Sequence, residues 1–171
     1  ILDEDENKQG SVIGDFNQWN NDPVHMASRQ NLPLQEITYA ERLKQNGYYN
    51  AFIGKWHLGG EAYYPIHQGF DEEIGVTPFG HPKSYYQPFF KSDNPFASAG
   101  EDEYLTDVVT AKTLDFIKNY DKSKPFELSL YYYNVHSPQI ARKDLFAKYK
   151  AAGLSDIQAT YASKVSAVDE S

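Results

Sequence analysis

The chain has 171 residues and a mass of 19.5 kDa, which is enough for one domain, or part of one, with a buried core. A mean hydropathy of -0.66 with scattered charges leaves no apolar run of membrane-spanning length, so we expect no membrane insertion. The net charge of -8 argues against nucleic acid as a partner, and the absence of cysteine excludes disulfides, thiolate metal sites and a cysteine nucleophile within this sequence.

The first regular elements are predicted in the second quarter of the chain. Residues 35–46 predict a helix whose apolar face is formed by Ile37, Ala40 and Leu43. Gly47 follows as a C-cap, and residues 48–53 (YYNAFI) then predict a short buried strand that ends at Gly54.

The middle of the chain contrasts a segment without periodicity with a clear helix. Residues 62–100 are rich in Gly, Pro and Tyr and predict an irregular surface segment. Residues 103–119 predict a helix with an apolar repeat of three, widened by two further side chains: Leu105, Val108, Ala111, Leu114 and Ile117, with Val109 and Phe116.

The last third of the chain adds a second strand, over residues 126–133, and a helix over residues 141–152. Ser155 and Gln158 have the spacing of a capping box and predict a final helix from residue 155 onward, with an apolar stripe of Ile157, Tyr161 and Val168. The order helix, strand, helix, strand, helix predicts an α/β fold with parallel strands.

Both ends of the chain have the character of interior sequence. Residue 1 is Ile, residues 1–9 show neither a basic start nor an apolar stretch, and the final helix has no stop signal. No signal peptide is visible. We therefore expect a chain that is truncated at both ends.

Polar side chains follow both predicted strands. Lys55 and His57 come directly after the first strand, and His136 follows the second. Open α/β sheets place ligands at the carboxyl ends of their strands, so these three residues form a candidate catalytic pocket for a tetrahedral oxyanion. The alternative is a solvated turn at Lys55 and His57 and a capping or packing role for His136.

Several motifs resemble the type I, formylglycine-dependent sulfatases, a family within the alkaline phosphatase superfamily. Residues 32–60 contain a helix of the T-x-A-E-x-L-K-x-x-G-Y kind that leads into GKWHLG. Residues 65–75 (PIHQGFDEEIG) and 124–138 (KPFELSLYYYNVHSP) are similar to two later blocks of that family, in the same order.

The resemblance implies an alkaline-phosphatase-like α/β sandwich with a mostly parallel sheet, a bound divalent cation, usually calcium, and hydrolysis of a sulfate ester. Sulfated carbohydrates and aryl sulfates are the implied substrates, and a periplasmic or secreted location is expected. The family roles assign Lys55 to a sulfate oxygen and the hydrated formylglycine. They place His57 beside that aldehyde hydrate, where it helps collapse the sulfated intermediate, and His136 near the leaving oxygen.

Some parts of the family pattern have no counterpart in this sequence. The Cys or Ser that becomes formylglycine is missing, and the segment from His25 to Arg29 matches its motif only superficially. The acidic run of Asp3, Asp5 and Glu6 does not match a metal-binding strand end, so no metal ligand is assigned. Residues 1–171 therefore predict a partial catalytic domain, with the nucleophile segment upstream and the second metal-ligand segment downstream.

Three further interpretations stay open. His81, Tyr85 and Tyr86, with Phe89, are candidates for a sugar-binding wall or for a covered loop. A phosphoester or phosphonate hydrolase of the same superfamily would share the pocket. A catalytically silent carbohydrate-binding fragment would have the same acidic, Tyr-rich composition, and the oligomeric state is left undetermined.

Overall fold

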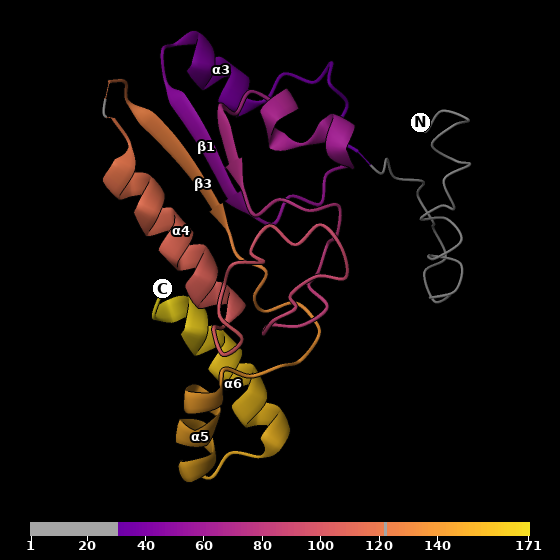
Figure 1. Cartoon of the computed structure of the whole chain (residues 1–171), viewed down its shortest axis with the longest axis vertical. Coiled ribbons are helices and arrows are strands. Elements are labelled where there is room, and N and C mark those ends of the chain that lie inside the picture. Colours follow the sequence, from indigo (N-terminus) through magenta and orange to yellow (C-terminus); the bar gives the residue numbers. More distant parts are fainter. Residues whose placement is uncertain (1–30, 122) are drawn as a thin grey trace, which may run out of the picture.

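The computed structural model describes residues 31–121 and 123–171 (Figure 1). The acidic run at Asp3, Asp5 and Glu6 and the segment from His25 to Arg29 lie outside these residues. Within the described ranges, no helix combines the length and the apolar character needed to cross a membrane.

The described chain contains the predicted helices and strands in the predicted order, with one further strand over residues 72–74 that the sequence pattern did not indicate. In chain order the elements are α3 (Tyr39–Gln45), β1 (Tyr49–Gly54), the 3-10 turns η1 (Glu61–Tyr63) and η2 (Pro65–His67), β2 (Glu72–Ile74), α4 (Leu105–Asn119), β3 (Phe126–Tyr131), α5 (Lys143–Ala151) and α6 (Asp156–Asp169).

The three strands form one parallel sheet in the order β2-β1-β3. Ala51 of β1 is paired with Glu72 of β2 on one side and with Leu128 of β3 on the other. The prediction of parallel strands is confirmed. Because the strands run in the same direction, their carboxyl ends all reach the centre of the molecule, where the long loops gather (Figure 1).

Alternate side chains of β1 build two separate cores. Ala51 and Ile53 have no exposed surface and join the larger core, which includes residues of α4. Phe52 points to the other face, where it packs with Ala40 of α3 and Phe70. A strand with a period of two is thus buried on both faces, as expected for the centre of a parallel sheet.

Helix α3 begins later than the sequence pattern predicts. Thr38 is its N-cap, and a capping box joins Thr38 to Glu41 in both directions. Ile37, which was expected on the buried face, lies before the helix and is 61% exposed. The cap residue therefore sets the start of the helix, because it satisfies backbone N–H groups of the first turn.

The buried face of α4 differs from the predicted stripe. Its buried residues are Leu105, Thr106, Val108, Val109, Thr113 and Phe116. Leu114 and Ile117, although apolar, are 48% and 42% exposed. A strict repeat of three residues falls about 60° short of a full turn at each step, since the helix has about 3.6 residues per turn, so the predicted stripe winds off the core-facing side.

The prediction of an irregular surface segment over residues 62–100 is wrong in two ways. The segment contains β2, which pairs with β1, and it supplies several of the most deeply buried aromatic side chains. Tyr85 and Phe89 have no exposed surface, and Phe96 is 1% exposed. Pro and Gly break the periodicity without moving the aromatic side chains out of the core.

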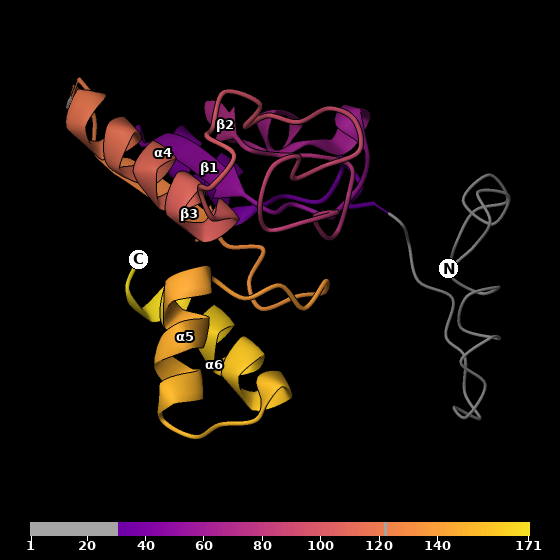
Figure 2. The same ribbon diagram turned by 60° about the horizontal axis from the view of Figure 1, so that its bottom comes forward.

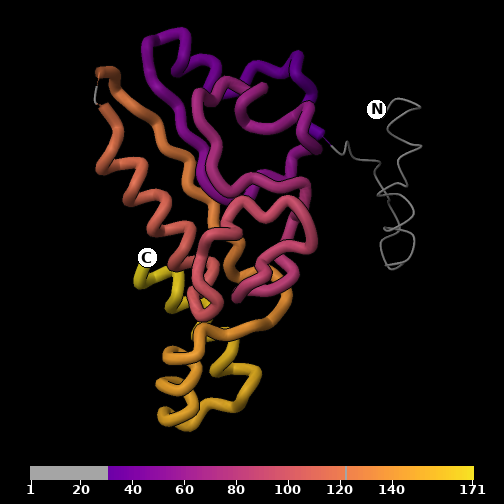
Figure 3. The backbone as a smooth tube through the Cα atoms, viewed as in Figure 1, coloured from indigo at the N-terminus to yellow at the C-terminus, as the bar shows by residue number. Residues whose placement is uncertain are grey.

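Helices α5 and α6 form a hairpin below the sheet layer (Figures 2 and 3). The capping box of Ser155 and Gln158 is confirmed. The predicted apolar stripe is wrong, because Ile157 is 84% exposed and Tyr161 is 54% exposed. The buried positions of α6 are instead Ala159, Ser163, Lys164 and Ala167. Small side chains allow the close approach of α5.

An ion-pair network around Arg142, just before α5, ties the hairpin to α4. Its guanidinium contacts Asp144 at 2.9 Å, Asp107 of α4 at 3.1 Å and Glu170 beyond α6. The acidic partners raise the pKa of Arg142, although its burial acts in the opposite direction. This network therefore joins three helices through one permanently charged side chain.

Gly54 offers a test of the link between the strands and the site. It has φ +106, and a Cβ at this position would lie 2.0 Å from the carbonyl oxygen of Tyr131. We expect Gly54→Ala to lower the free energy of unfolding by roughly 3 kcal/mol or more, measured by urea denaturation. Gly60→Ala is the control, because nothing lies within 4 Å of its Cβ position. Equal stability of the two variants would contradict this geometry.

Candidate active site

The first part of the site is the turn that follows β1. The backbone N–H of Lys55 donates to the carbonyl oxygen of Tyr131 at 2.9 Å, which ties the end of β1 to the end of β3. Trp56 anchors the turn through a hydrogen bond from its indole N–H to the carbonyl oxygen of Tyr63 at 2.9 Å. Lys55 and His57 therefore leave the sheet from a fixed backbone.

The backbone of His57 has φ 58, a left-handed conformation that is uncommon for any residue with a side chain. Strained backbone of this kind often occurs at functional sites. The imidazole packs directly on Gly80, where an added Cβ would lie 2.2 Å from Cε1 of the ring. Glycine at position 80 therefore makes the space that the ring of His57 occupies.

The second part of the site is the loop that follows β3. His136 donates its backbone N–H to the carbonyl oxygen of Tyr133 at 3.0 Å. Its Nδ1 lies 3.1 Å from both the carbonyl oxygen and the Oγ of Ser137. The other ring nitrogen, Nε2, is thus the one left to face a ligand. The exposed ring stacks on that of His81, with centroids 5.4 Å apart and planes 14° apart.

Electrostatics shows that these side chains share one neighbourhood. Partial burial of the ring lowers the pKa of His57, although the residue keeps exposed surface, and the positive charges of Lys55, His136 and His81 lower it further. The structure therefore brings Lys55, His57 and His136 together at one edge of the sheet, as the sequence predicts. Their catalytic roles stay predictions.

The proposed sugar-binding wall is divided by the structure. His81 joins the basic cluster through its contact with His136. Tyr85 and Phe89 have no exposed surface, so their rings offer no face to a sugar in this structure. Tyr86 is half-buried, and its hydroxyl accepts the backbone N–H of Lys143 at 3.0 Å. Burial, which the sequence pattern did not reveal, separates these neighbours in sequence.

The cluster is suited to a tetrahedral oxyanion. An ammonium group supplies a fixed positive charge, and an imidazole whose pKa is lowered is neutral near pH 7 and able to accept a proton. Across residues 31–121 and 123–171, no group of three His, Asp or Glu side chains is placed to hold a metal ion. These residues therefore do not fit a resident cation, and no step is assigned to one.

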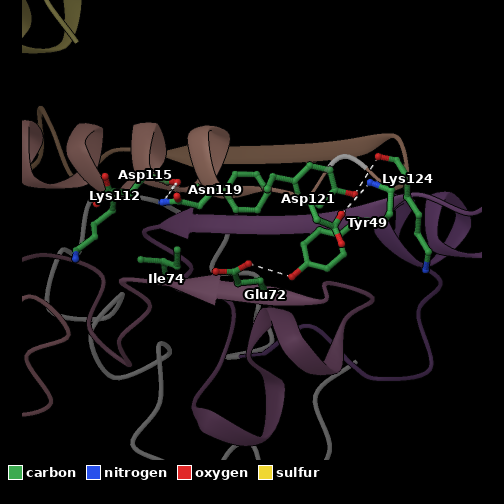
Figure 4. A pocket seen from close by; sticks show the side chains of 11 residues that line it. Tyr49, Glu72, Ile74, Lys112, Asp115, Asn119, Asp121 and Lys124 are labelled. Carbon is green, nitrogen blue, oxygen red and sulfur yellow. Dashed lines mark hydrogen bonds between the residues drawn. The ribbon is translucent and has the colours of Figure 1, made fainter.

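Among the described residues, cavities lie on both faces of β1, beside Tyr49 on one face and beside Phe52 on the other. A groove of about 340 Å³, lined largely by aromatic and aliphatic side chains, adjoins Lys55 on the α3 face. A larger cavity of about 670 Å³ lies between α4 and β2 (Figure 4). Its lining runs from Tyr49, the first residue of β1, to Ile74, the last residue of β2, and includes neither Lys55 nor His57.

Sequence reasoning missed two residues that shape this site. Gly80 gave no periodic or chemical signal, because its importance is the space it leaves for His57. Lys164 lies in the predicted final helix without any chemical motif that marks it, yet its ammonium group reaches the carbonyl oxygens of His136 and Pro138. The run of small residues on the same face of α6 is the one sequence signal that pointed to its burial.

Comparison with known families gives a match over most of the chain. The family model described as Sulfatase matches residues 14–171.

Curated relatives match over shorter spans. An N-acetylglucosamine-6-O-sulfatase of Bacteroides thetaiotaomicron is 39% identical over 89 residues, which are 52% of this chain and 15% of that protein. Arylsulfatase J of Mus musculus is 28% identical over 151 residues, which are 81% of this chain and 25% of that protein. The chain thus spans a quarter or less of the length of these two relatives.

Solved structures show the same likeness in three dimensions. Ps i-CgsB, in complex with k-i-k-neocarrahexaose, has a TM-score of 0.66 and 28% identity, over 84% of this chain and 36% of that one. BT4656, in complex with its substrate D-glucosamine-2-N,6-O-disulfate, has a TM-score of 0.54 and 27% identity, over 74% of this chain and 24% of that one.

The electrostatic arrangement predicts a particular titration of His57. Its pKa lies below the ordinary value of 6.5, and Lys55→Met should raise it only in part, because burial is the larger cause and remains. Histidine ring resonances followed by NMR against pH report this midpoint, and His57→Gln assigns the signal. Because the unfolded chain binds this proton more readily, His57 should lower the stability as the pH falls from about 6.5 to its lowered pKa, with no further loss from this residue at lower pH.

Lys118→Met is the matched control, since Lys118 is exposed on α4, away from the turn of His57. It should leave the midpoint of His57 unchanged. A midpoint at or above 6.5 in the wild-type chain, or one that ignores Lys55→Met, would contradict the described cluster.

Proposed function

The chain belongs to the sulfatase family, and from that premise we propose that the complete protein is a sulfuric ester hydrolase acting on a sulfated carbohydrate or an aryl sulfate. Its fold is the α/β, alkaline-phosphatase-like arrangement that the sequence predicted, with a parallel sheet at its centre. The observation that supports the proposal is the convergence of Lys55, His57 and His136 at the carboxyl edge of β1 and β3.

Each residue has a chemical role in this proposal. The ammonium group of Lys55 lies beside a sulfate oxygen and stabilises the negative charge that this oxygen carries. His57 accepts a proton, which its lowered pKa favours near neutral pH. His136 donates a proton from Nε2 to the leaving oxygen, while Ser137 holds Nδ1 and so fixes the orientation of the ring.

Two groups of the proposed reaction are not among the described residues. The nucleophile is a formylglycine formed from a Cys or Ser, and this sequence contains no cysteine and no serine in the family's motif. A divalent cation, calcium in this proposal, would be held by ligands outside the described residues and would supply Lewis-acid chemistry in the complete protein. The roles of Lys55, His57 and His136 follow from their own chemistry and do not depend on the identity of that cation.

The substrate class is supported by the relatives. One curated relative is named for removal of 6-O-sulfate from N-acetylglucosamine, and the substrate of BT4656 is a sulfated glucosamine. Ps i-CgsB binds an oligosaccharide. A sulfated sugar is therefore the first substrate to test, with nitrophenyl sulfate as the activated comparison and nitrophenyl phosphate as the test of a phosphoester hydrolase.

Lys55 should contribute strongly to turnover in the complete enzyme. We expect Lys55→Ala to lower kcat/KM by roughly a hundredfold or more, or about 3 kcal/mol, because one preorganised cation is lost from the transition state. Its melting temperature should scarcely change. Lys118→Ala, at an exposed position of α4, is the control. Activity of folded Lys55→Ala within a few-fold of wild type would return GKWHLG to the structural-turn interpretation.

His136 should matter most for poor leaving groups. We expect His136→Ala to reduce kcat/KM for a sugar sulfate far more than for nitrophenyl sulfate, because only a poor leaving group needs a proton. His67→Ala, at an exposed histidine of η2, is the control.

Two other outcomes would give a different assignment to His136. Equal losses with both substrates would refute the acid role and leave an electrostatic one. A loss of thermal stability without a change in the rate of the folded fraction would indicate a packing residue. If His136→Ala and Lys55→Ala both leave every sulfate ester unaffected, the proposed function fails.

A further inference from the structure

Lys164 of α6 is a charged side chain inside the protein. It has no exposed surface. Its ammonium group donates to the carbonyl oxygen of His136, donates to that of Pro138 at 2.9 Å, and lies 4.3 Å from the ring centroid of Tyr85. A buried cation is costly unless it is hydrogen bonded, so a lysine at this position calls for an explanation beyond packing.

The partners of Lys164 all belong to one neighbourhood. Among the described residues it forms no ion pair with a carboxylate, and two main-chain carbonyl groups and an aromatic face surround its ammonium group instead. Both carbonyl groups lie in the loop that carries the imidazole of His136. The helix also receives a bond from that loop, because the Nδ2 of Asn134 donates to the carbonyl oxygen of Lys164 at 2.8 Å.

A second side chain holds the same loop from another direction. The hydroxyl of the buried Tyr85 lies 2.8 Å from the carbonyl oxygens of both Tyr133 and His136. The carbonyl of His136 is therefore contacted by Tyr85 from the aromatic segment and by Lys164 from α6. The ring of Tyr85 also covers the ammonium group of Lys164, so the two side chains support each other.

We propose that Lys164 is a positioning residue for His136: together with Tyr85 it fixes the main chain of residues 136–138 and so sets where the imidazole lies. The inference rests on the proposed function, because it assigns Lys164 a role through His136. The loop has little apolar surface of its own to pack, since His136 and Ser137 are exposed. Hydrogen bonds to its carbonyl groups take the place of packing.

Removal of the ammonium group should leave the chain folded. In Lys164→Met, the carbonyl oxygen of His136 still accepts a hydrogen bond from the hydroxyl of Tyr85. The carbonyl oxygen of Pro138 still accepts one from the backbone N–H of Ile140 at 3.0 Å. Methionine has a similar length and needs no hydrogen bond at a buried position. The loop should therefore loosen without exposing the core.

The test is a double-mutant cycle between Lys164→Met and His136→Ala in the complete enzyme. Lys164→Met alone should lower kcat for a sugar sulfate by roughly tenfold to a hundredfold, with a smaller loss for nitrophenyl sulfate. In the His136→Ala background, Lys164→Met should cause almost no further loss, because the residue it positions is gone. Equal fold losses in the two backgrounds, or no loss in the wild-type background, would overturn the proposal.

Ser163→Ala is the matched control for a merely structural role. Ser163 is the neighbour of Lys164 on α6, is also fully buried, and also bonds the main chain, but its partner is Arg142, with Oγ 2.9 Å from the backbone nitrogen. It should lower the melting temperature while leaving kcat and the substrate asymmetry unchanged. If Ser163→Ala reproduces the effect of Lys164→Met, positioning of His136 is not the cause.

Tyr85→Phe keeps the test decisive if Lys164→Met does not fold. This variant retains the buried ring and removes the hydroxyl, and with it the contacts to the carbonyl oxygens of His136 and Tyr133, both in the segment that carries the imidazole. Tyr85→Phe should reduce kcat for the sugar sulfate more than for nitrophenyl sulfate, and it should cause almost no further loss in the His136→Ala background. If either result is absent, the proposal is overturned. Equal losses of kcat/KM for the sugar sulfate and for nitrophenyl sulfate in His136→Ala itself would instead refute the acid role of His136. Failure of the proposed function is therefore distinguishable from failure of the positioning role of Lys164.

The pH dependence of stability gives a readout that needs no substrate. Burial lowers the pKa of Lys164 from 10.5 to about 8, and its facing groups are Tyr85 and the His136 loop. Between these values the unfolded chain holds a proton that the folded chain has released, so Lys164 favours folding more as the pH rises from about 8 to 10.5. The stability of wild type relative to Lys164→Met should rise across this range. A flat difference would show that Lys164 is not buried as described, which removes the basis of the proposal.

Discussion

The parallel pairing of β1 with β3 is the constraint on which the site depends. All six residues of β1 are in register with β3, from Tyr49 opposite Phe126 to Gly54 opposite Tyr131. Two parallel strands of equal length that start in register also end together, and the residues that follow them emerge at one edge. A shift of register would carry the turn of Lys55 away from the loop of His136, so the site is a consequence of strand pairing before it is a consequence of local chemistry.

The site is rigid because the sheet behind it is buried on both faces. One face of β1 packs on α4 through Ala51 and Ile53, and the other packs on α3 through Phe52. Gly54 then lets the last residue of β1 approach the carbonyl of Tyr131, where any Cβ would clash. Lys55 therefore begins from a backbone that has little freedom, which is the condition for preorganised electrostatic stabilisation of an anion.

The loops that complete the site are held by close packing at one point and by hydrogen bonds to buried side chains at another. The ring of His57 packs on Gly80, and the main chain of His136 accepts hydrogen bonds from Tyr85 and Lys164. The charged groups that shift the pKa of His57 are all cationic, which suits an anionic ligand and keeps the imidazole neutral. The same loop architecture thus gathers positive charge around an imidazole with a lowered pKa, which agrees with the roles proposed for these residues in the family to which the chain belongs.

The sequence alone determined the helices and strands other than β2, the capping box of Ser155 and Gln158, the parallel pairing of the strands and the candidate residues Lys55, His57 and His136, because these depend on local patterns and on topology. It did not determine which faces of α4 and α6 are buried, nor that Tyr85 is in the core while His81 stacks on His136. Only the tertiary structure decided these, since burial depends on where segments distant in sequence pack. Lys164 shows the reason: the hydrogen bonds that make its burial possible come from carbonyl groups more than twenty residues away, and no helical pattern contains them.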